Sequence, residues 1–273
     1  MKLSLGFSTC PNDTFMFDAL VNGRIDQDEF EFDLTLADIL HLNRSAVAGQ
    51  FDIVKLSYNT YGMVKDDYEL LTAGSAMGVG CGPLLIAKEP ISIQGLVDKN
   101  AEIAIPGKNT TANLLLSFFA PELENRKEML FHEVMPAVLS GKADAGLIIH
   151  ENRFTYQDEG LVCLQDLGAY WEDETKLPIP LGAICVRKSL GEEVIKKIDA
   201  LLNQSIAYAF ANPEASKSYI KTHAQELSDE VTQAHIKLYV NDFSLDMGDK
   251  GRAAVKKLLS VGADMGLYSG HNS

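Results

Sequence analysis

The first 188 residues alternate short apolar runs with stretches of helical periodicity, and this alternation constrains the fold more than any other feature of the chain. Most runs are rich in β-branched side chains and bounded by Gly, Pro, Asn or Asp, which predicts strands at residues 2–7, 30–36, 53–56, 69–73, 83–87, 102–105, 145–149 and 181–187. Helices are predicted between them at residues 13–22, 37–48, 111–119 and 132–140. Strand–helix–strand alternation is typical of mostly parallel sheets with helices on both faces, so the predicted fold class is α/β.

Residues 189–265 carry helical patterns almost throughout, and three of the predicted helix starts have capping signals. Ser189 and Glu192 form a capping-box pattern, in which each side chain satisfies a free backbone N–H group of the first turn. Asn212 precedes Pro213, a residue favoured in the first helical turn. Ser228 is followed by two acidic residues, which the helix dipole favours at this end.

Two apolar segments, 82–88 and 180–188, are each introduced by Pro and Gly and bracket about 100 residues, a common size for a domain. We therefore predict two lobes joined by two hinge crossings. The large lobe is discontinuous and comprises residues 1–84 and 187–273, with a helical C-terminal part, and the small inserted lobe comprises residues 85–186. Ligands bind preferentially between such lobes, which predicts an interlobe cleft.

The charge balance restricts the class of partner. The chain has 24 basic and 38 acidic residues and a formal net charge of −14. Because phosphate backbones and anionic membrane surfaces both attract basic clusters, we expect neither nucleic acid nor a membrane as partner. No run approaches the roughly 20 apolar residues of a membrane span. A small anion stays compatible with this charge, because backbone N–H groups at helix starts can hold it locally. The oligomeric state is left open.

The sequence gives no sign of a metal or cofactor site. Four cysteines are far apart without metal-ligand spacing, and we interpret them as reduced thiols of a cytoplasmic protein: Cys10, Cys81, Cys163 and Cys185. Residues 1–8 are typical of a strand and not of a secretion signal. There is no HExxH, GxSxG or P-loop motif, and the glycine-rich residues 74–82 lack the helix and acid of a dinucleotide site.

Three predicted strand-to-helix turns are rich in hydroxyl, amide and glycine groups, at residues 8–14, 55–60 and 106–112. In an open α/β sheet such turns lie where ligands bind, and first-turn N–H groups favour a carboxylate or phosphate. Candidate substrate contacts from these turns are Asn12, Thr14, Ser57, Thr110 and Thr111. The same residue types are also ordinary helix caps, so each turn by itself leaves both interpretations open.

An apolar strand at residues 145–149 ends in His150, which would face the predicted cleft. An imidazole with a pKa near 6.5 suits proton transfer at neutral pH, although a structural histidine tying strand to loop fits the local pattern as well. Arg153 follows closely and is a further candidate contact. We interpret the remaining histidines as surface, capping or tail groups: His41, His132, His223, His235 and His271.

These segments resemble the 1,4-dihydroxy-6-naphthoate synthases of the futalosine route to menaquinone. The similarity is carried by residues 6–15, 55–58, 107–112 and 146–156, and it continues through 166–168, 177–183 and 223–230. The run His-Glu-Asn-Arg-Phe-Thr-Tyr at 150–156, directly after a strand, is the most specific of these motifs. The resemblance therefore covers most of the chain.

The resemblance implies a two-lobed fold like that of type 2 periplasmic binding proteins. It also implies a lyase reaction that converts cyclic dehypoxanthine futalosine, an aromatic carboxylate, to 1,4-dihydroxy-6-naphthoate with loss of a sugar-derived fragment and without a cofactor or metal. The proton acceptor of the family aligns with His150, whose tautomer we expect Glu151 or a backbone carbonyl to fix. The family's substrate contacts correspond to Lys55, Leu56, Ser57, Thr111 and Ala112.

Two other functions fit a cleft of this kind, because a fold does not fix a function. The first is a solute-binding protein without chemistry. The second is a different enzyme on the same scaffold, such as the related chorismate dehydratase, whose substrate is also a carboxylate.

Overall fold

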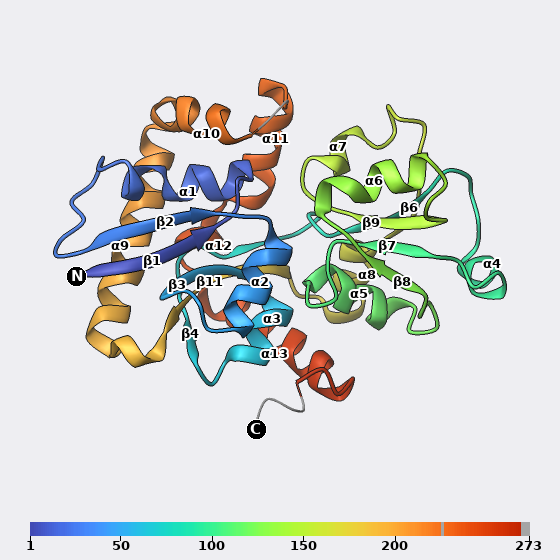
Figure 1. Cartoon of the computed structure of the whole chain (residues 1–273), viewed down its shortest axis with the longest axis horizontal. Helices are drawn as coiled ribbons and strands as arrows, with labels where there is room; N and C mark the ends of the chain where they lie inside the picture. The colour runs from blue at the N-terminus through green and yellow to red at the C-terminus, as the bar shows by residue number, and fades with distance from the viewer. Residues whose placement is uncertain (225–226, 269–273) are drawn as a thin grey trace.

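The computed structural model describes residues 1–224 and 227–268 and shows two lobes, each built on one β-sheet (Figure 1). His271 lies outside the described residues. The strands of the first lobe are β1 (Lys2–Phe7), β2 (Glu31–Leu36), β3 (Ile53–Ser57), β4 (Tyr68–Leu70), β5 (Ala76–Gly78) and β11 (Ile179–Arg187). Those of the second lobe are β6 (Leu84–Ala87), β7 (Ile103–Ile105), β8 (Arg126–Glu128), β9 (Ala145–Ile148) and β10 (Val162–Asp166).

Both sheets are mixed, which corrects the prediction of mostly parallel sheets. The first has the order β2-β1-β3-β11-β4, with β5 also paired to β11, and the second has the order β10-β6-β9-β7-β8. β1 pairs in parallel with β2 and β3, whereas β11 is antiparallel to all its partners. In the second sheet β7 has parallel neighbours, whereas β6 is antiparallel to β9 and β10. The antiparallel strands β6 and β11 each enter their sheet directly after a crossing between the lobes.

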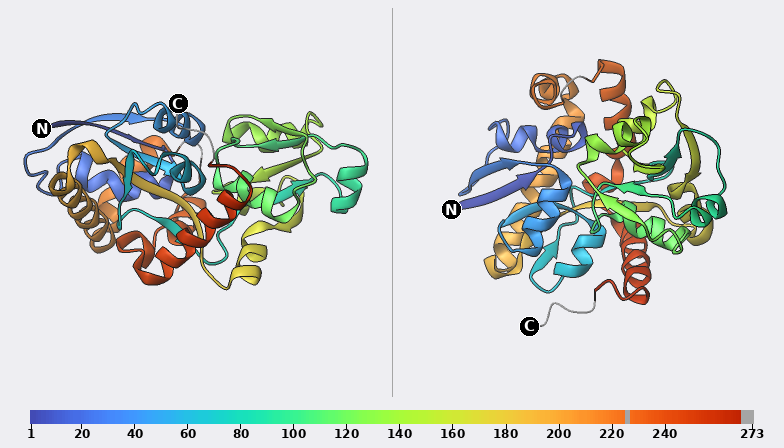
Figure 2. Two further views of the ribbon diagram at one scale, coloured as in Figure 1. Left: turned by 90° about the horizontal axis from the view of Figure 1, so that it is seen from below. Right: turned by 45° about the vertical axis from the view of Figure 1, so that its right-hand side comes forward.

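Helices flank both sheets. The second lobe carries α4 (Ile93–Asp98), α5 (Thr111–Phe119), α6 (Phe131–Leu139), α7 (Asn152–Thr155) and α8 (Leu167–Thr175). The first lobe carries α1 (Pro11–Val21), α2 (Ile39–Val47), α3 (Tyr58–Val64), α9 (Glu192–Ala211), α10 (Lys217–His223), α11 (Asp229–Tyr239), α12 (Asp242–Leu245), α13 (Gly248–Asp264) and the 3₁₀ turns η1 (Lys188–Leu190) and η2 (Pro213–Ser216). Figure 2 shows the C-terminal helices, orange to red, gathered on the first lobe, where α9 and α11 pack against α1.

Most predicted elements are present within a few residues of their expected bounds, and the strand 2–7 and the helix 111–119 match to the residue. The sequence missed β5, β8 and β10, the first two of which have only three residues each. The predicted cap at Ser189 is wrong, because Ser189 lies in η1 and α9 begins after Gly191, whose φ of 88° ends that turn. The cap at Ser228 is confirmed, whereas Asn212 precedes a 3₁₀ turn as predicted but makes no side-chain capping hydrogen bond.

Sheet membership also revises where the chain crosses between lobes. β11, predicted to be a crossing, pairs only with strands of the first sheet. The crossings are therefore the segments 79–83, between β5 and β6, and 176–178, between α8 and β11. The predicted boundary at 186/187 moves to the residues before Ile179. That these crossings act as hinges stays a prediction.

A shared apolar core supports both crossings. The largest buried cluster contains side chains of both lobes, among them Leu56 of β3, Leu147 of β9 and Trp171 of α8. Trp171 is fully buried, and its indole N–H donates to the carbonyl of Pro178 in the second crossing at 3.1 Å. The two lobes are therefore in direct contact below the cleft. Within the described residues, no helix combines the length and apolar character that a membrane span needs.

Candidate active site

A pocket lies between the lobes. The first lobe contributes Ser8, Asn12, Asp13, Ile39, Lys55, Ser57, Ala76, Leu181, Gly182 and Tyr239 to its wall. The second lobe contributes Pro106, Thr110, Thr111, Ala112, Phe131, Ile149 and His150. This pocket adjoins a wider outer cleft that shares Ser8, Ile39, Phe131 and His150 with it. The three predicted turns and the predicted histidine thus meet at one place.

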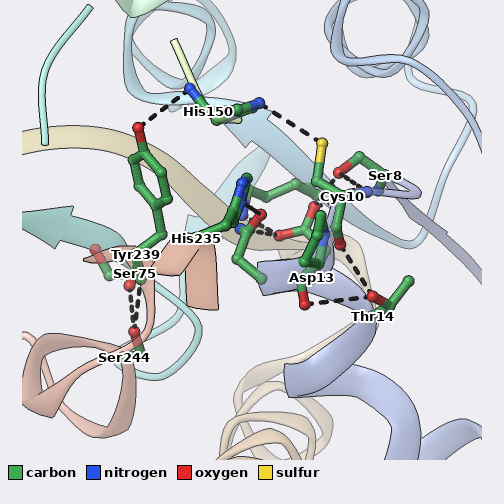
Figure 3. A network of polar contacts seen from close by, with 12 residues as sticks. Ser8, Cys10, Asp13, Thr14, Ser75, His150, His235, Tyr239 and Ser244 are labelled. Carbon is green, nitrogen blue, oxygen red and sulfur yellow. Dashed lines mark hydrogen bonds and ion pairs between the residues drawn. The ribbon is translucent and has the colours of Figure 1, made fainter. Parts of the chain in front are cut away.

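His150 lies two residues after the end of β9 and reaches across the cleft to the first lobe (Figure 3). Its backbone N–H donates to the hydroxyl of Tyr239 at 3.1 Å, and its Nδ1 lies 3.6 Å from the sulfur of Cys10. The expectation that Glu151 or a backbone carbonyl fixes the tautomer is wrong, because the atom facing Nδ1 is this sulfur and the Glu151 carboxylate faces His235. Cys10 lies in the predicted turn 8–14 but was not a candidate contact, and Tyr239 belongs to no motif that the sequence analysis singled out.

The environment keeps this imidazole neutral. Burial lowers the pKa of His150 to about 4, with a smaller contribution from the Lys55 ammonium, while the Asp13 carboxylate opposes the shift. Burial also raises the pKa of the Cys10 thiol well above its usual range, so Cys10 is a protonated, weakly polar neighbour. At neutral pH the site therefore presents an uncharged imidazole that is able to accept a proton.

The floor of the pocket is a buried ion pair. Lys55 of β3 and Asp13 of α1 are 5% and 1% exposed, and the ammonium lies 2.5 Å from Asp13 Oδ1. The carboxylate also accepts hydrogen bonds from the Asn12 amide at 2.8 Å and from the Ser8 hydroxyl and backbone N–H group at 2.7 and 3.2 Å. With four donors on two oxygens, Asp13 is held in one orientation.

A second histidine, which is fully buried, lies behind this floor. His235 of α11 is 0% exposed, so the prediction of a surface or capping group is wrong for it. Its Nε2 lies 2.9 Å from Asn12 Oδ1, and its Nδ1 lies 3.6 Å from Glu151 Oε2 of the second lobe. Its place on the buried stripe of α11 with Ile236 and Tyr239 is the sequence signal that could have revealed it.

The opposite end of the pocket is lined by hydroxyl groups. Thr110 caps α5 by accepting from the Asn113 N–H group at 3.2 Å, and the Thr111 hydroxyl donates to the Leu181 carbonyl at 2.9 Å. Ser57 exchanges two hydrogen bonds with Asn43, a buried residue that the sequence did not single out. The hydroxyl protons of both threonines are already donated, because Thr110 also donates to the Gly107 carbonyl at 2.7 Å. A carboxylate near the start of α5 would therefore be held by the Ser57 hydroxyl and by first-turn N–H groups of the helix.

Three predicted contacts lie outside the pocket wall. Leu56 points to the opposite face of β3 from Lys55 and Ser57, as strand alternation requires, and is 0% exposed. The Thr14 hydroxyl is bound to the Cys10 and Pro11 carbonyls. The Arg153 guanidinium binds Asp166 at 2.9 Å and the carbonyls of residues 80 and 82, so it fastens α7 to the first crossing. Among the residues that the structure describes, no cluster of His, Cys, Asp and Glu could hold a metal ion.

Comparison with known proteins identifies relatives along nearly the whole chain. The family model for menaquinone biosynthesis matches residues 3–264. The chain is 47% identical over 266 residues to a 1,4-dihydroxy-6-naphthoate synthase of Thermus thermophilus, which aligns 97% of this chain with 95% of that protein. It is 44% identical over 271 residues to the synthase of Streptomyces coelicolor, with coverages of 97% and 94%.

Solved structures support the same relationship at the level of the fold. A protein from Archaeoglobus fulgidus superposes with a TM-score of 0.91 at 36% identity, covering 97% of this chain and 98% of that one. The periplasmic aliphatic sulphonate-binding protein of Escherichia coli superposes with a TM-score of 0.65 at 12% identity, with coverages of 97% and 88%. The second likeness concerns the fold alone and confirms the predicted two-lobed, periplasmic-binding-protein-like class. By sequence and by structure, the chain belongs to the family of menaquinone-biosynthesis enzymes that includes the 1,4-dihydroxy-6-naphthoate synthases.

Proposed function

We propose that this enzyme is a lyase that converts cyclic dehypoxanthine futalosine to 1,4-dihydroxy-6-naphthoate, with His150 as the proton acceptor. The observation that carries the proposal is a neutral imidazole in the wall of the interlobe pocket, which also contains the hydroxyls of Ser57 and Thr111. The relatives of highest similarity reported above bear the name of this activity.

The tautomer of His150 that fits this role carries its proton on Nδ1. In that form Nδ1–H points at the Cys10 sulfur, a weak acceptor 3.6 Å away, and the lone pair of Nε2 is free for the substrate. An imidazole that is neutral before substrate binds can remove a proton without first losing one of its own. The proton comes from the sugar-derived part of the substrate, whose loss leaves the naphthoate.

The two ends of the pocket suggest how the substrate lies. Its carboxylate fits the start of α5, where the Ser57 hydroxyl and first-turn N–H groups can donate to it, and Lys55 adds positive charge nearby. Its aromatic part fits between apolar walls that include Ile39 and Phe131. The sugar-derived part then lies toward His150 and the outer cleft, and Ser8 and Asn12 can contact its oxygen atoms.

Replacement of the imidazole tests this assignment. We expect His150→Ala to lower kcat by roughly 10²-fold or more, since general-base catalysis typically contributes that much. His41→Ala is the matched control, because His41 is exposed and absent from the pocket wall. Product formation is followed by mass spectrometry with the purified substrate. Near-normal turnover by a folded His150→Ala variant would show that His150 is not the base.

The same assay separates the alternatives. Incubating the wild-type protein with cyclic dehypoxanthine futalosine and, separately, with chorismate distinguishes the proposed lyase from a dehydratase. Tight binding of the first compound without any product would instead indicate a binding protein.

We further propose that the enzyme works in the cytoplasm with reduced cysteines, since its four thiols are all free in the structure. Cell fractionation with an antibody against the protein tests the location. Recovery in an oxidising compartment would contradict it.

A further inference from the structure

We propose that Tyr239 is a positioning residue, whose hydroxyl holds the backbone of His150 in the left-handed conformation that aims the imidazole into the pocket. This inference rests on the proposed function, because it takes His150 as the base. Tyr239 forms the C-terminal end of α11, and its hydroxyl accepts the His150 backbone N–H at 3.1 Å (Figure 3).

The backbone of His150 needs such a partner. Its φ is +56°, in the left-handed region that side chains other than Gly enter at a cost of about 1–2 kcal/mol. The conformation is held from two sides: the N–H group donates to Tyr239, and the carbonyl accepts from the Arg153 N–H group at 3.2 Å. The second bond is local and belongs to the turn into α7. Only the first ties His150 to the other lobe through its backbone.

The ring of Tyr239 limits where the imidazole can turn. The two rings are edge to face, with centroids 5.4 Å apart and an interplanar angle of 85°. Phe131 contacts the imidazole with a centroid distance of 5.2 Å, and the His235 ring lies 5.3 Å away. The imidazole is therefore packed between rings of both lobes, and a phenylalanine at 239 would keep this packing while losing only the hydroxyl.

The hydroxyl stays neutral in this place. Burial raises the pKa of Tyr239 well above its usual range, so the phenol keeps its proton and accepts the His150 N–H as a neutral group. The groups around it that carry or can carry charge are Cys81, Arg153 and Glu151, together with the neighbouring rings of His150 and His235. Tyr239 thus contributes geometry and not charge to the site.

The contact joins two lobes. His150 follows β9 of the second lobe, whereas α11 packs against α1 and β5 of the first. The other polar neighbour of the imidazole, Cys10, also belongs to the first lobe. His150 therefore reaches its working position only where the second lobe meets α11, so positioning of the base depends on the approach of the lobes.

The test is Tyr239→Phe, with Tyr68→Phe as matched control. Tyr68 is equally buried, and its hydroxyl donates to the Phe51 carbonyl at 2.7 Å, away from the pocket. We expect Tyr239→Phe to lower kcat about tenfold, the effect of losing one hydrogen bond of about 1.4 kcal/mol, with KM changed less than about twofold. Tyr68→Phe should leave both constants near their wild-type values. Equal effects of the two variants, or a rise in KM alone, would overturn the inference.

A double-mutant cycle separates this inference from the proposed function. If Tyr239 acts through His150, Tyr239→Phe should cause no further loss in a His150→Ala background, as judged by quantifying residual product by mass spectrometry. A further tenfold loss in that background would show that Tyr239 acts on its own and overturn the inference. Normal turnover by His150→Ala alone would instead refute the base assignment. Thermal melts of both Phe variants check that each is folded at the assay temperature.

Discussion

The two lobes differ in what they bury. In the part of the chain that the structure describes, all but two of the buried polar or charged residues belong to the first lobe, and the exceptions are the pocket threonines Thr110 and Thr111. Below the pocket, the first lobe encloses a connected network that runs from Lys55 and Asp13 through Asn12 to His235. The second lobe has a largely apolar interior and brings Thr110, Thr111 and His150 to the pocket.

This difference indicates what each lobe contributes to the site. A network whose members are all held by hydrogen bonds within one lobe keeps its geometry whether or not the lobes meet. His150 has its polar side-chain and hydroxyl contacts across the cleft, with Cys10 and Tyr239. We infer that the first lobe is the preorganised surface and that the second lobe delivers the base to it.

The largest effect is expected where the buried charge pair of the first lobe is broken. Asp13→Asn leaves the Lys55 ammonium buried without its counter-charge, and such a loss typically costs about 3–5 kcal/mol of the free energy of unfolding. Urea denaturation measures this change. The double variant Asp13→Asn/Lys55→Met removes both charges and should recover part of the loss.

An exposed ion pair of the second lobe is the control for this comparison. Asp173 and Lys176 are 3.8 Å apart and largely exposed, so Asp173→Asn should change the free energy of unfolding by less than about 1 kcal/mol. Equal costs for Asp13→Asn and Asp173→Asn would mean that the first lobe is not more dependent on its internal charges than the second. The contrast between the lobes would then be lost.

A smaller effect is expected from the pH response of His150. Its pKa is about 4 in the folded protein and near 6.5 in the unfolded chain, so between these values the unfolded chain binds more protons. The free energy of unfolding therefore falls as the pH is lowered from about 6.5 to 4, by about 3 kcal/mol for this group. Urea denaturation at a series of pH values should show a shallower fall for His150→Gln, whereas exposed His41→Gln should keep the wild-type slope.

The same pKa predicts the pH dependence of activity. If His150 is the base, kcat/KM should stay level from pH 8 down to about 5 and fall only as the pH approaches 4, where the imidazole becomes protonated. Returning acid-treated enzyme to pH 7 before assay distinguishes protonation from unfolding. An acidic limb centred near 6.5 would indicate that the imidazole is solvated and not held in the closed site.

The sequence predicted the parts of the site that local patterns encode. The strand that leads to His150 and the hydroxyl-bearing start of α5 are each visible within about ten residues. Tyr239 is 89 residues away from His150 along the chain, and His235 is 223 residues from Asn12, so these contacts depend on how α11 packs on the first lobe.

The sequence also did not reveal where a side chain points or in which direction a strand runs within its sheet. The motif that contains His150 also contains Arg153, yet the turn into α7 sends its guanidinium to the first crossing and not into the pocket. The mixed sheets were missed for a similar reason, because a run such as β11 has the same apolar pattern in a parallel or an antiparallel place.

The smallest expected effect concerns a polar contact between the lobes in which two hydrogen-bond acceptors face each other, His235 Nδ1 and Glu151 Oε2. Asn12 donates its amide to Asp13, so its oxygen accepts from His235 Nε2–H, and the lone pair of Nδ1 is left facing Glu151 Oε2. Neither Nδ1 nor Oε2 has a hydrogen-bond partner within the described residues. At neutral pH two acceptors thus face each other across the cleft.

Glu151→Gln replaces one of these acceptors with an amide that can donate to Nδ1. We expect the free energy of unfolding to rise by about 1 kcal/mol at pH 8, the net value of one hydrogen bond.

Burial raises the pKa of Glu151, so the native wild-type protein takes up this proton more readily than the unfolded chain and gains stability as the pH falls. The advantage of the variant should therefore shrink on acidification, whereas Glu174→Gln, at an exposed position of α8, should change stability by less than about 0.5 kcal/mol at any pH. A loss of stability in Glu151→Gln at pH 8 would mean that the carboxylate is already paired with a protonated His235. An ion pair would then join the second lobe to the network of the first, instead of two facing acceptors.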